Sequence, residues 1–151
     1  MQPPSHPPEP ANEPLRSVHT DTLAQVFDQL GVSLVISTYQ AGRVIVARLD
    51  GDRINTHFRG YDRPMGIAVD GPRLAIGSTR TVWTLRDMPG VARRLDPPER
   101  HDACYLPRRV HVTGDIDIHE MAYDADHELW IVNTKFGCLC TLDDDHSFSP
   151  R

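Results

Sequence analysis

An internal repeat constrains the fold of this chain more than any other feature of its sequence. Residues 66–85 (GIAVDGPRLAIGSTRTVWTL) align with residues 120–142 (EMAYDADHELWIVNTKFGCLCTL) when small insertions are allowed in the turns. A partial earlier copy at residues 34–49 keeps the apolar run, the Ser37-Thr38 pair and the closing Leu49. The copies lie about 40 and 55 residues apart, and such a period is typical of propeller blades and related β arrays.

Each complete copy predicts three short strands joined by turns. A strand with small residues, such as Ile67-Ala68-Val69, runs into a turn that contains Asp. A second strand returns and ends in Ser-Thr or Asn-Thr, pairs whose polar groups suit turn hydrogen bonds. A third strand closes on Leu85 or Leu142. Because such a unit cannot bury its apolar face alone, residues 32–151 are predicted to form an all-β array of two to three antiparallel blades, an incomplete β-propeller.

The N-terminal segment has a different composition. Six of the 13 prolines fall within residues 1–14, and almost nothing apolar accompanies them. A segment of this kind cannot bury enough apolar surface to offset the entropy lost on ordering. Residues 1–18 are therefore predicted to be a disordered Pro-rich leader.

A single helix is predicted between the leader and the first strand. The segment assigned to it is residues 19–31, and the helix itself is expected at about residues 21–30. Four apolar residues recur there at helical spacing: Leu23, Val26, Phe27 and Leu30. Thr20 or Asp21 is expected to cap its N-terminus, and Gly31 suits a left-handed C-terminal stop. The helix is expected to cover a sheet edge or the bottom of the domain.

Charge and hydropathy argue against several classes of partner. The formal net charge is -5, and residues 111–151 carry 2 basic and 9 acidic side chains, so no basic stripe for nucleic acid is expected. No run approaches 18 apolar residues, and the N-terminus lacks the pattern of a signal peptide, which argues against a membrane or secreted protein. Three cysteines in such a chain favour reduced thiols in the cytoplasm.

The phrase Pro64-Met65-Gly66-Ile67-Ala68-Val69-Asp70, followed by Leu74, resembles the short repeat of propellers of the lactonase, NHL and streptogramin-lyase type. Residues 33–145 more specifically resemble a bacterial family of uncharacterised, conserved-hypothetical propeller-like proteins. The resemblance implies a propeller fold without an established activity. Members of that family are longer, so the chain is expected either to lack C-terminal blades or to complete a ring with other copies.

The most suggestive polar segment is HVTGDIDIHE, residues 111–120, in which polar and apolar residues alternate. An extended backbone would place alternate side chains on one face: His111, Thr113, Asp115, Asp117 and His119. Neighbours on such a face are about 7 Å apart, so at most two could bind one metal ion directly. Further ligands would have to come from other blades.

His119 aligns with Met65, just before the predicted inner strand. The resemblance implies that this end of a blade faces a central channel, where related lyases and lactonases place metal ligands and acid-base groups. It makes His119 and Glu120 the candidate catalytic residues, and His119 and Asp117 the candidate ligands of one divalent metal ion. The alternative is a histidine that is bonded to water or backbone.

Three other segments have competing interpretations. Cys138 and Cys140 could contribute to a soft-metal site, but their apolar neighbours favour core packing. Cys104 with His101 could form a nucleophile pair, although spacing alone says nothing about their geometry. The Arg-rich segment 86–109 has no clear strand pattern and would be either an anion-binding loop or a solvated connection between blades.

Two classes of function follow. The first is a binding or scaffold module for a small molecule or a protein partner, which needs no special residues. The second is a metal-assisted lyase or hydrolase with a channel-facing His119, completed by blades outside this chain. Propellers host both classes, so the fold alone does not decide between them.

Overall fold

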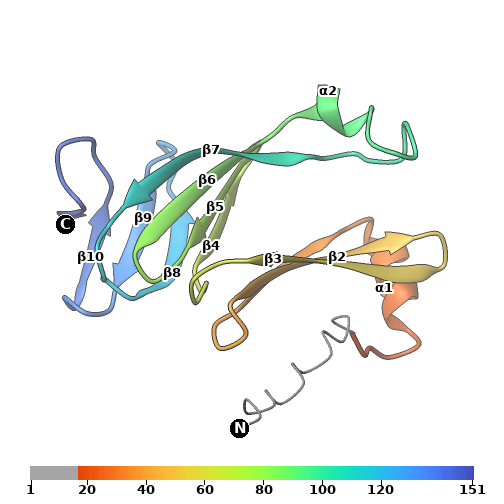
Figure 1. Ribbon diagram of the computed structural model, residues 1–151, viewed down its shortest axis with the longest axis horizontal. Helices are drawn as coiled ribbons and strands as arrows, with labels where there is room; N and C mark the ends of the chain where they lie inside the picture. The colour runs from red at the N-terminus through yellow and green to blue at the C-terminus, as the bar shows by residue number, and fades with distance from the viewer. Residues whose placement is uncertain (1–16) are drawn as a thin grey trace, which may run out of the picture.

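The computed structural model describes residues 17–151, so most of the predicted leader, residues 1–16, lies outside the described part. Strands dominate the described chain (Figure 1). In chain order the elements are α1 (Leu23–Leu30), β1 (Leu34–Thr38), β2 (Arg43–Asp50), β3 (Arg53–Gly60), β4 (Ile67–Asp70), β5 (Arg73–Gly77), β6 (Thr81–Asp87), α2 (Pro89–Ala92), β7 (Tyr105–Val112), β8 (Ile118–Tyr123), β9 (Leu129–Asn133), β10 (Cys138–Thr141) and β11 (Ser149–Pro150).

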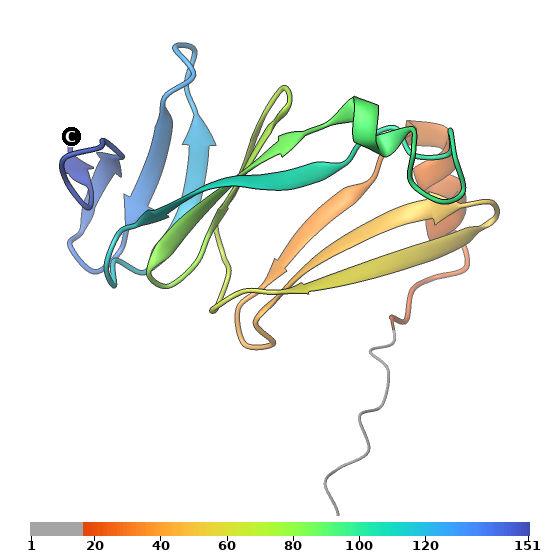
Figure 2. The same cartoon turned by 45° about the horizontal axis from the view of Figure 1, so that its top comes forward.

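The strands form three antiparallel sheets, each built from strands that are consecutive in the chain. The first sheet has the order β1-β2-β3, the second β4-β5-β6-β7 and the third β8-β9-β10-β11. The sheets follow one another along the long axis of the molecule (Figures 1 and 2). The prediction of an all-β chain of antiparallel sheets is confirmed.

The first two strands of the second and third sheets pair in corresponding registers. Val69 lies opposite Leu74 in the second sheet, and Tyr123 lies opposite Leu129 in the third. Further along the pairing, Ile76 is flanked by Ile67 and Trp83, and Ile131 is flanked by Met121 and Cys140. These pairs are the ones that the alignment of residues 66–85 with residues 120–142 makes equivalent.

A hydrophobic core lies between the second and third sheets. The second sheet contributes Ala68, Ala75 and Val82, the connection between the sheets contributes Ile116, and the third sheet contributes Ile118, Met121, Ile131 and Cys140. Gly77 lies at the closest approach, because an added Cβ there would lie 2.6 Å from Cγ2 of Ile118. A glycine at this position therefore allows β5 to pack directly on β8.

A second core lies between the first and second sheets. Val44 of β2 packs with Leu74, Ile76 and Leu85 on the other face of the second sheet. The second sheet is thus buried on both faces. Ile76 of the second sheet faces the first sheet, and Ile131 of the third sheet faces the second. The repeat alignment makes these two residues equivalent.

The position of β1 in the first sheet differs by one residue from the position that the predicted repeat alignment gives it. Ser37 donates a hydrogen bond from Oγ to the carbonyl oxygen of Met65, at 2.6 Å, so it occupies the place relative to the second sheet that Gly77 occupies relative to the third. The predicted alignment instead matches Ser37 with Ser78. Because side chains alternate between faces, a shift of one residue moves every side chain of a strand to the other face, and the apolar run alone does not define this register.

The helix α1 lies within the segment where a helix is predicted and ends at Gly31, with φ of 60°. Its N-cap is Thr22, which makes no side-chain cap hydrogen bond, so the expected cap at Thr20 or Asp21 is wrong. Phe27 is buried where α1 packs against β2 and β3. No helix among residues 17–151 is long and apolar enough to cross a bilayer.

The Arg-rich segment is more regular than predicted. Strand β6 extends to Asp87 and β7 begins at Tyr105, so both ends of the segment belong to the second sheet. The connection between them carries the short helix α2 and reaches back to the first sheet (Figure 2). There Arg48 Nη1 lies 2.8 Å from Nδ1 of His101, and Arg100 lies 3.7 Å from Asp50.

Candidate functional site

The extended run predicted for residues 111–119 is wrong. Strand β7 ends at Val112 and β8 begins at Ile118, and the chain turns between them as it crosses from the second sheet to the third. Gly114 and Asp117 have positive φ angles of 69° and 51°, which an extended strand cannot contain. His111 and His119 therefore belong to different sheets and do not share one face.

His119 and Glu120 lie in an irregular stretch of β8. Ile118 is opposite Asn133 and Met121 is opposite Ile131, so β8 has one more residue than β9 between these two pairs. Such a bulge bends a strand and redirects side chains, often next to functional sites. Both His119 and Glu120 are exposed.

Asp117 is the residue that the structure brings closest to His119. Its Oδ2 atom lies 3.9 Å from Nε2 of His119, and both side chains are partly exposed. The positive φ of Asp117 is uncommon for a residue other than glycine. Within residues 17–151, no group of three His, Cys, Asp or Glu side chains is arranged to hold a metal ion. His119 and Asp117 therefore lie close to each other, and no third such side chain within residues 17–151 joins them in a metal-binding arrangement.

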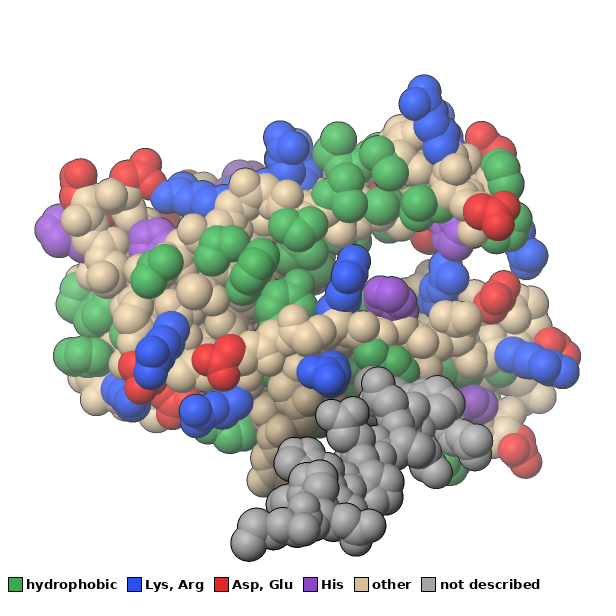
Figure 3. Space-filling view, viewed as in Figure 1, with side chains coloured by type: hydrophobic (Ala, Val, Ile, Leu, Met, Phe, Trp, Pro, Cys, Tyr) green, Lys and Arg blue, Asp and Glu red, His purple; other side chains and the backbone are tan. Residues whose placement is uncertain are grey.

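A cavity of about 470 Å³ lies between the first and second sheets. The first and second sheets diverge toward the α2 connection (Figure 1), and the space-filling view shows a gap between that connection and the first sheet (Figure 3). The lining comes from β2, from the connection between β3 and β4, and from the β5–β6 hairpin: Arg43, Gly60, Tyr61, Asp62, Ser78, Thr81 and Trp83.

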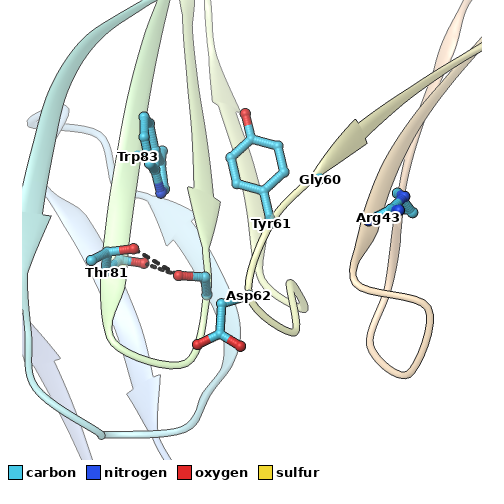
Figure 4. Close-up of a pocket in the computed structure, with 7 residues that line it drawn as sticks. Arg43, Gly60, Tyr61, Asp62, Thr81 and Trp83 are labelled. Carbon is cyan, nitrogen blue, oxygen red and sulfur yellow. Dashed lines mark hydrogen bonds between the residues drawn. The ribbon is translucent and has the colours of Figure 1, made fainter. Parts of the chain in front are cut away.

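Two aromatic side chains form one wall of this cavity, which we call the inter-sheet cavity (Figure 4). The rings of Tyr61 and Trp83 meet edge to face, with centroids 5.7 Å apart and planes inclined by 85°. This geometry is favourable for aromatic pairs, and the two rings, perpendicular to each other, present apolar surface to the cavity. Burial raises the pKa of the Tyr61 hydroxyl, although the charge of Arg59 opposes this, so the hydroxyl stays a neutral hydrogen-bond donor at neutral pH.

Two side chains of opposite charge lie at the edges of the aromatic wall. The Asp62 carboxylate lies below the two rings, and Arg43 lies across from them on the first sheet (Figure 4). The Ser78 hydroxyl is already engaged, since its Oγ lies 2.7 Å from Oγ1 of Thr81 and 3.0 Å from the Thr81 carbonyl oxygen. The cavity thus offers an apolar surface with one cationic and one anionic group at its edges.

A second cavity, of about 500 Å³, lies between the second and third sheets. Its polar side chains contact one another both within the second sheet and across the gap. Arg73 forms an ion pair with Asp70 and lies over the ring of Tyr123, 5.0 Å from its centroid. His127 Nδ1 lies 3.0 Å from Asp70, and Arg109 pairs with Asp144. The contacts of His127 with Asp70 and of Arg109 with Asp144 therefore join the second and third sheets.

The cysteines lie in positions that favour packing. Cys140 is fully buried in the core between the second and third sheets, and that burial raises the pKa of its thiol. His101 makes no site with Cys104, because its Nδ1 contacts Arg48 and its Nε2 lies 3.2 Å from the Asp96 carbonyl oxygen. The Cys104 amide instead donates to Asp87, at 2.8 Å.

The sequence does not identify the residues of the inter-sheet cavity as a site. Tyr61 and Asp62 fall between two copies of the repeat, and Arg43 belongs to the partial first copy. The alignment treats Trp83 only as a packing position equivalent to Cys140. The available signal is the pair of aromatic residues in neighbouring units, but their contact depends on how two sheets pack, which no local pattern shows.

Comparison with known families identifies one match. The profile of a domain of unknown function, DUF4915, matches residues 21–151. The chain therefore belongs to the DUF4915 family. No curated protein and no solved structure is significantly similar to it.

Proposed function

We propose that this DUF4915 chain is a binding module built from propeller-like blades, and that the inter-sheet cavity holds a small molecule. The cavity carries the proposal because it combines the Tyr61–Trp83 wall with Arg43 and Asp62 at its edges. Binding sites are typically apolar clefts with a few placed polar groups. The expected ligand has a flat apolar part and at least one charged group.

The equal registers of the second and third sheets support the propeller-like arrangement. Each of these sheets places corresponding residues toward the sheet that precedes it, as Ile76 and Ile131 do. The third sheet also exposes Val132 and Leu139 on the face away from the second sheet, and Phe136 is exposed in the turn between β9 and β10. This far face suits a further blade or a protein partner, which is the scaffold role of such a module.

Binding to the inter-sheet cavity can be tested with three matched probes: phenylalanine, 3-phenylpropionate and phenethylamine. All three carry a phenyl ring, but the second has only the carboxylate and the third only the ammonium group. Removing the aromatic wall in Trp83→Ala is expected to weaken binding of the best probe by about 5- to 150-fold, since a ring in a pocket contributes roughly 1–3 kcal/mol. Isothermal titration calorimetry measures the affinity.

The charge at the cavity edge should decide which probe binds. Arg43→Gln is expected to weaken the two carboxylate probes and to leave phenethylamine unchanged, because only the carboxylates can pair with the guanidinium group. Phe136→Ala is the matched control, since Phe136 is exposed outside the inter-sheet cavity. Equal affinities in wild type, Trp83→Ala and Phe136→Ala would overturn the assignment.

A second candidate function is a metal-assisted lyase or hydrolase. The observation that favours it is the bulge at His119 and Glu120, together with the approach of Asp117 to His119. In this function His119 and Asp117 bind a divalent metal ion, Glu120 acts as an acid-base group, and further ligands come from other blades.

Zinc binding tests this second function. His119→Ala is expected to weaken Zn²⁺ binding at least about tenfold, because it removes one of the ligands. His127→Ala is the matched control, since His127 pairs with Asp70 and is also available to solvent. If both variants bind Zn²⁺ as the wild type does, His119 is not a ligand and the metal-assisted function loses its main residue.

A further inference from the structure

The first sheet has three strands where each of the other two has four. The contacts of β1 show which strand it lacks. Gly77, at the end of β5, lies against Ile118 and Met121 of β8, and Ser37, near the end of β1, bonds to Met65 just before β4. Strand β1 therefore holds the position of β5, the second strand of its sheet. Among residues 17–151, no strand holds the position beside β1 that β4 holds beside β5.

The connections between sheets agree with this assignment. The last strand of the first sheet leads to the first strand of the second, β3 to β4, and the second sheet leads to the third in the same way, β7 to β8. In each connection, the carbonyl oxygen of an aspartate accepts a backbone hydrogen bond from the sheet that follows. The Thr79 amide donates to the Asp62 carbonyl at 3.0 Å, and the Thr134 amide donates to the Asp117 carbonyl at 3.4 Å. Strand β4 then packs against β8, whereas β1 has no comparable contact with β4.

The described residues before β1 do not fill the open position. Helix α1 packs against β2 and β3, and Ser17 Oγ lies 3.4 Å from Oγ1 of Thr56 in β3. These contacts place residues 17–30 on the side of the sheet away from the β1 edge. Within residues 17–151, β2 is the only strand that pairs with β1.

The composition of β1 is that of a strand with a partner on each side. Exposed edges are normally protected by charges or proline. The outer edges of the three sheets carry such residues: Arg53, His57 and Arg59 in β3, Pro107, Arg108 and Arg109 in β7, and Pro150 in β11. Strand β1, with the sequence LVIST, has none, and Leu34 and Ile36 are 44% and 41% exposed.

We propose that the free edge of β1 binds one additional antiparallel strand with the pattern shared by β4 and β8. That pattern is an apolar residue, alanine, a larger apolar residue and then aspartate, as in Ile67-Ala68-Val69-Asp70. If the new strand pairs with β1 as β4 pairs with β5, its alanine lies opposite Val35. Backbone hydrogen bonds supply affinity in this mode, and alternate side chains supply specificity. The proposal rests on the equivalence of the sheets and not on the inter-sheet cavity.

A synthetic peptide of residues 64–72, PMGIAVDGP, tests the proposal on the full chain. Hydrogen exchange of the backbone amides is measured with and without the peptide. At about ten times its Kd, the peptide is expected to slow exchange of the β1 amides that face the free edge about tenfold. A matched peptide with Ala68→Pro should have no effect, because proline lacks the amide donor and does not fit a central strand.

Slow exchange at Ile131 and Cys140, in paired strands of the third sheet, reports in the same spectra that the chain is folded. Unchanged exchange at residues 34–38, or equal protection by the proline peptide, overturns the proposal. Protection at β3 or β7 in place of β1 also overturns it, since the binding is then not selective for this edge. Protection of β1 without peptide that increases with protein concentration identifies a second copy as the occupant, which contradicts the proposed strand.

Discussion

Replacing Gly77 with alanine is expected to lower the free energy of unfolding by about 3 kcal/mol. The added Cβ would lie 2.6 Å from Cγ2 of Ile118 and 3.2 Å from Sδ of Met121, both of which are buried in the core between the second and third sheets. Relieving such an overlap requires side chains or strands to move, and overpacking of this kind costs about 1–3 kcal/mol. Urea unfolding followed by tryptophan fluorescence measures the difference.

Gly90→Ala is the matched control for this substitution. An added Cβ at Gly90, in α2, meets no atom within 4 Å. Because alanine also favours helix over glycine by about 1 kcal/mol, Gly90→Ala should leave stability unchanged or raise it slightly. If Gly77→Ala is as stable as Gly90→Ala, then β5 does not pack closely on β8.

Ile131→Ala is expected to destabilise the chain by about 4 kcal/mol. Ile131 is 1% exposed and packs in the core with Ile116 and Cys140, so the substitution leaves a cavity in addition to the lost burial. Val132→Ala is the control on the same strand, since Val132 points to the other face and is 37% exposed. That variant should lose less than about 1 kcal/mol. Similar losses for both variants would mean that β9 does not turn Ile131 toward the second sheet.

The hairpin registers can be predicted from the sequence because both complete copies of the repeat keep the two-residue period of a strand. Matching Leu74 with Leu129 is sufficient to place Ile76 and Ile131 at equivalent positions. The partial copy at residues 34–49 has too few distinctive residues to fix its register, and its predicted alignment is one residue out. In a strand, that error exchanges the two faces.

The candidate sites are harder to predict because they depend on turns and on packing between sheets. The alternation of residues 111–119 indicates one strand, but Gly114 and Asp117 adopt positive φ angles and the chain changes sheet there. The contact of Tyr61 with Trp83 joins a connecting segment to a strand of the second sheet, and neither residue lies in a recognisable motif. Alternation describes a strand only where the backbone remains extended.

A double-mutant cycle between Gly77 and Ile118 measures whether the second and third sheets pack face to face as equivalent units. Ile118→Ala removes the methyl group that the new side chain of Gly77→Ala would meet, and is expected to cost about 3 kcal/mol by itself. The double variant should therefore be more stable than the sum of the single losses implies, by about 2 kcal/mol, as measured by urea unfolding. Losses that add to within about 0.5 kcal/mol would show that the two positions are independent, and would contradict the packing of β5 on β8.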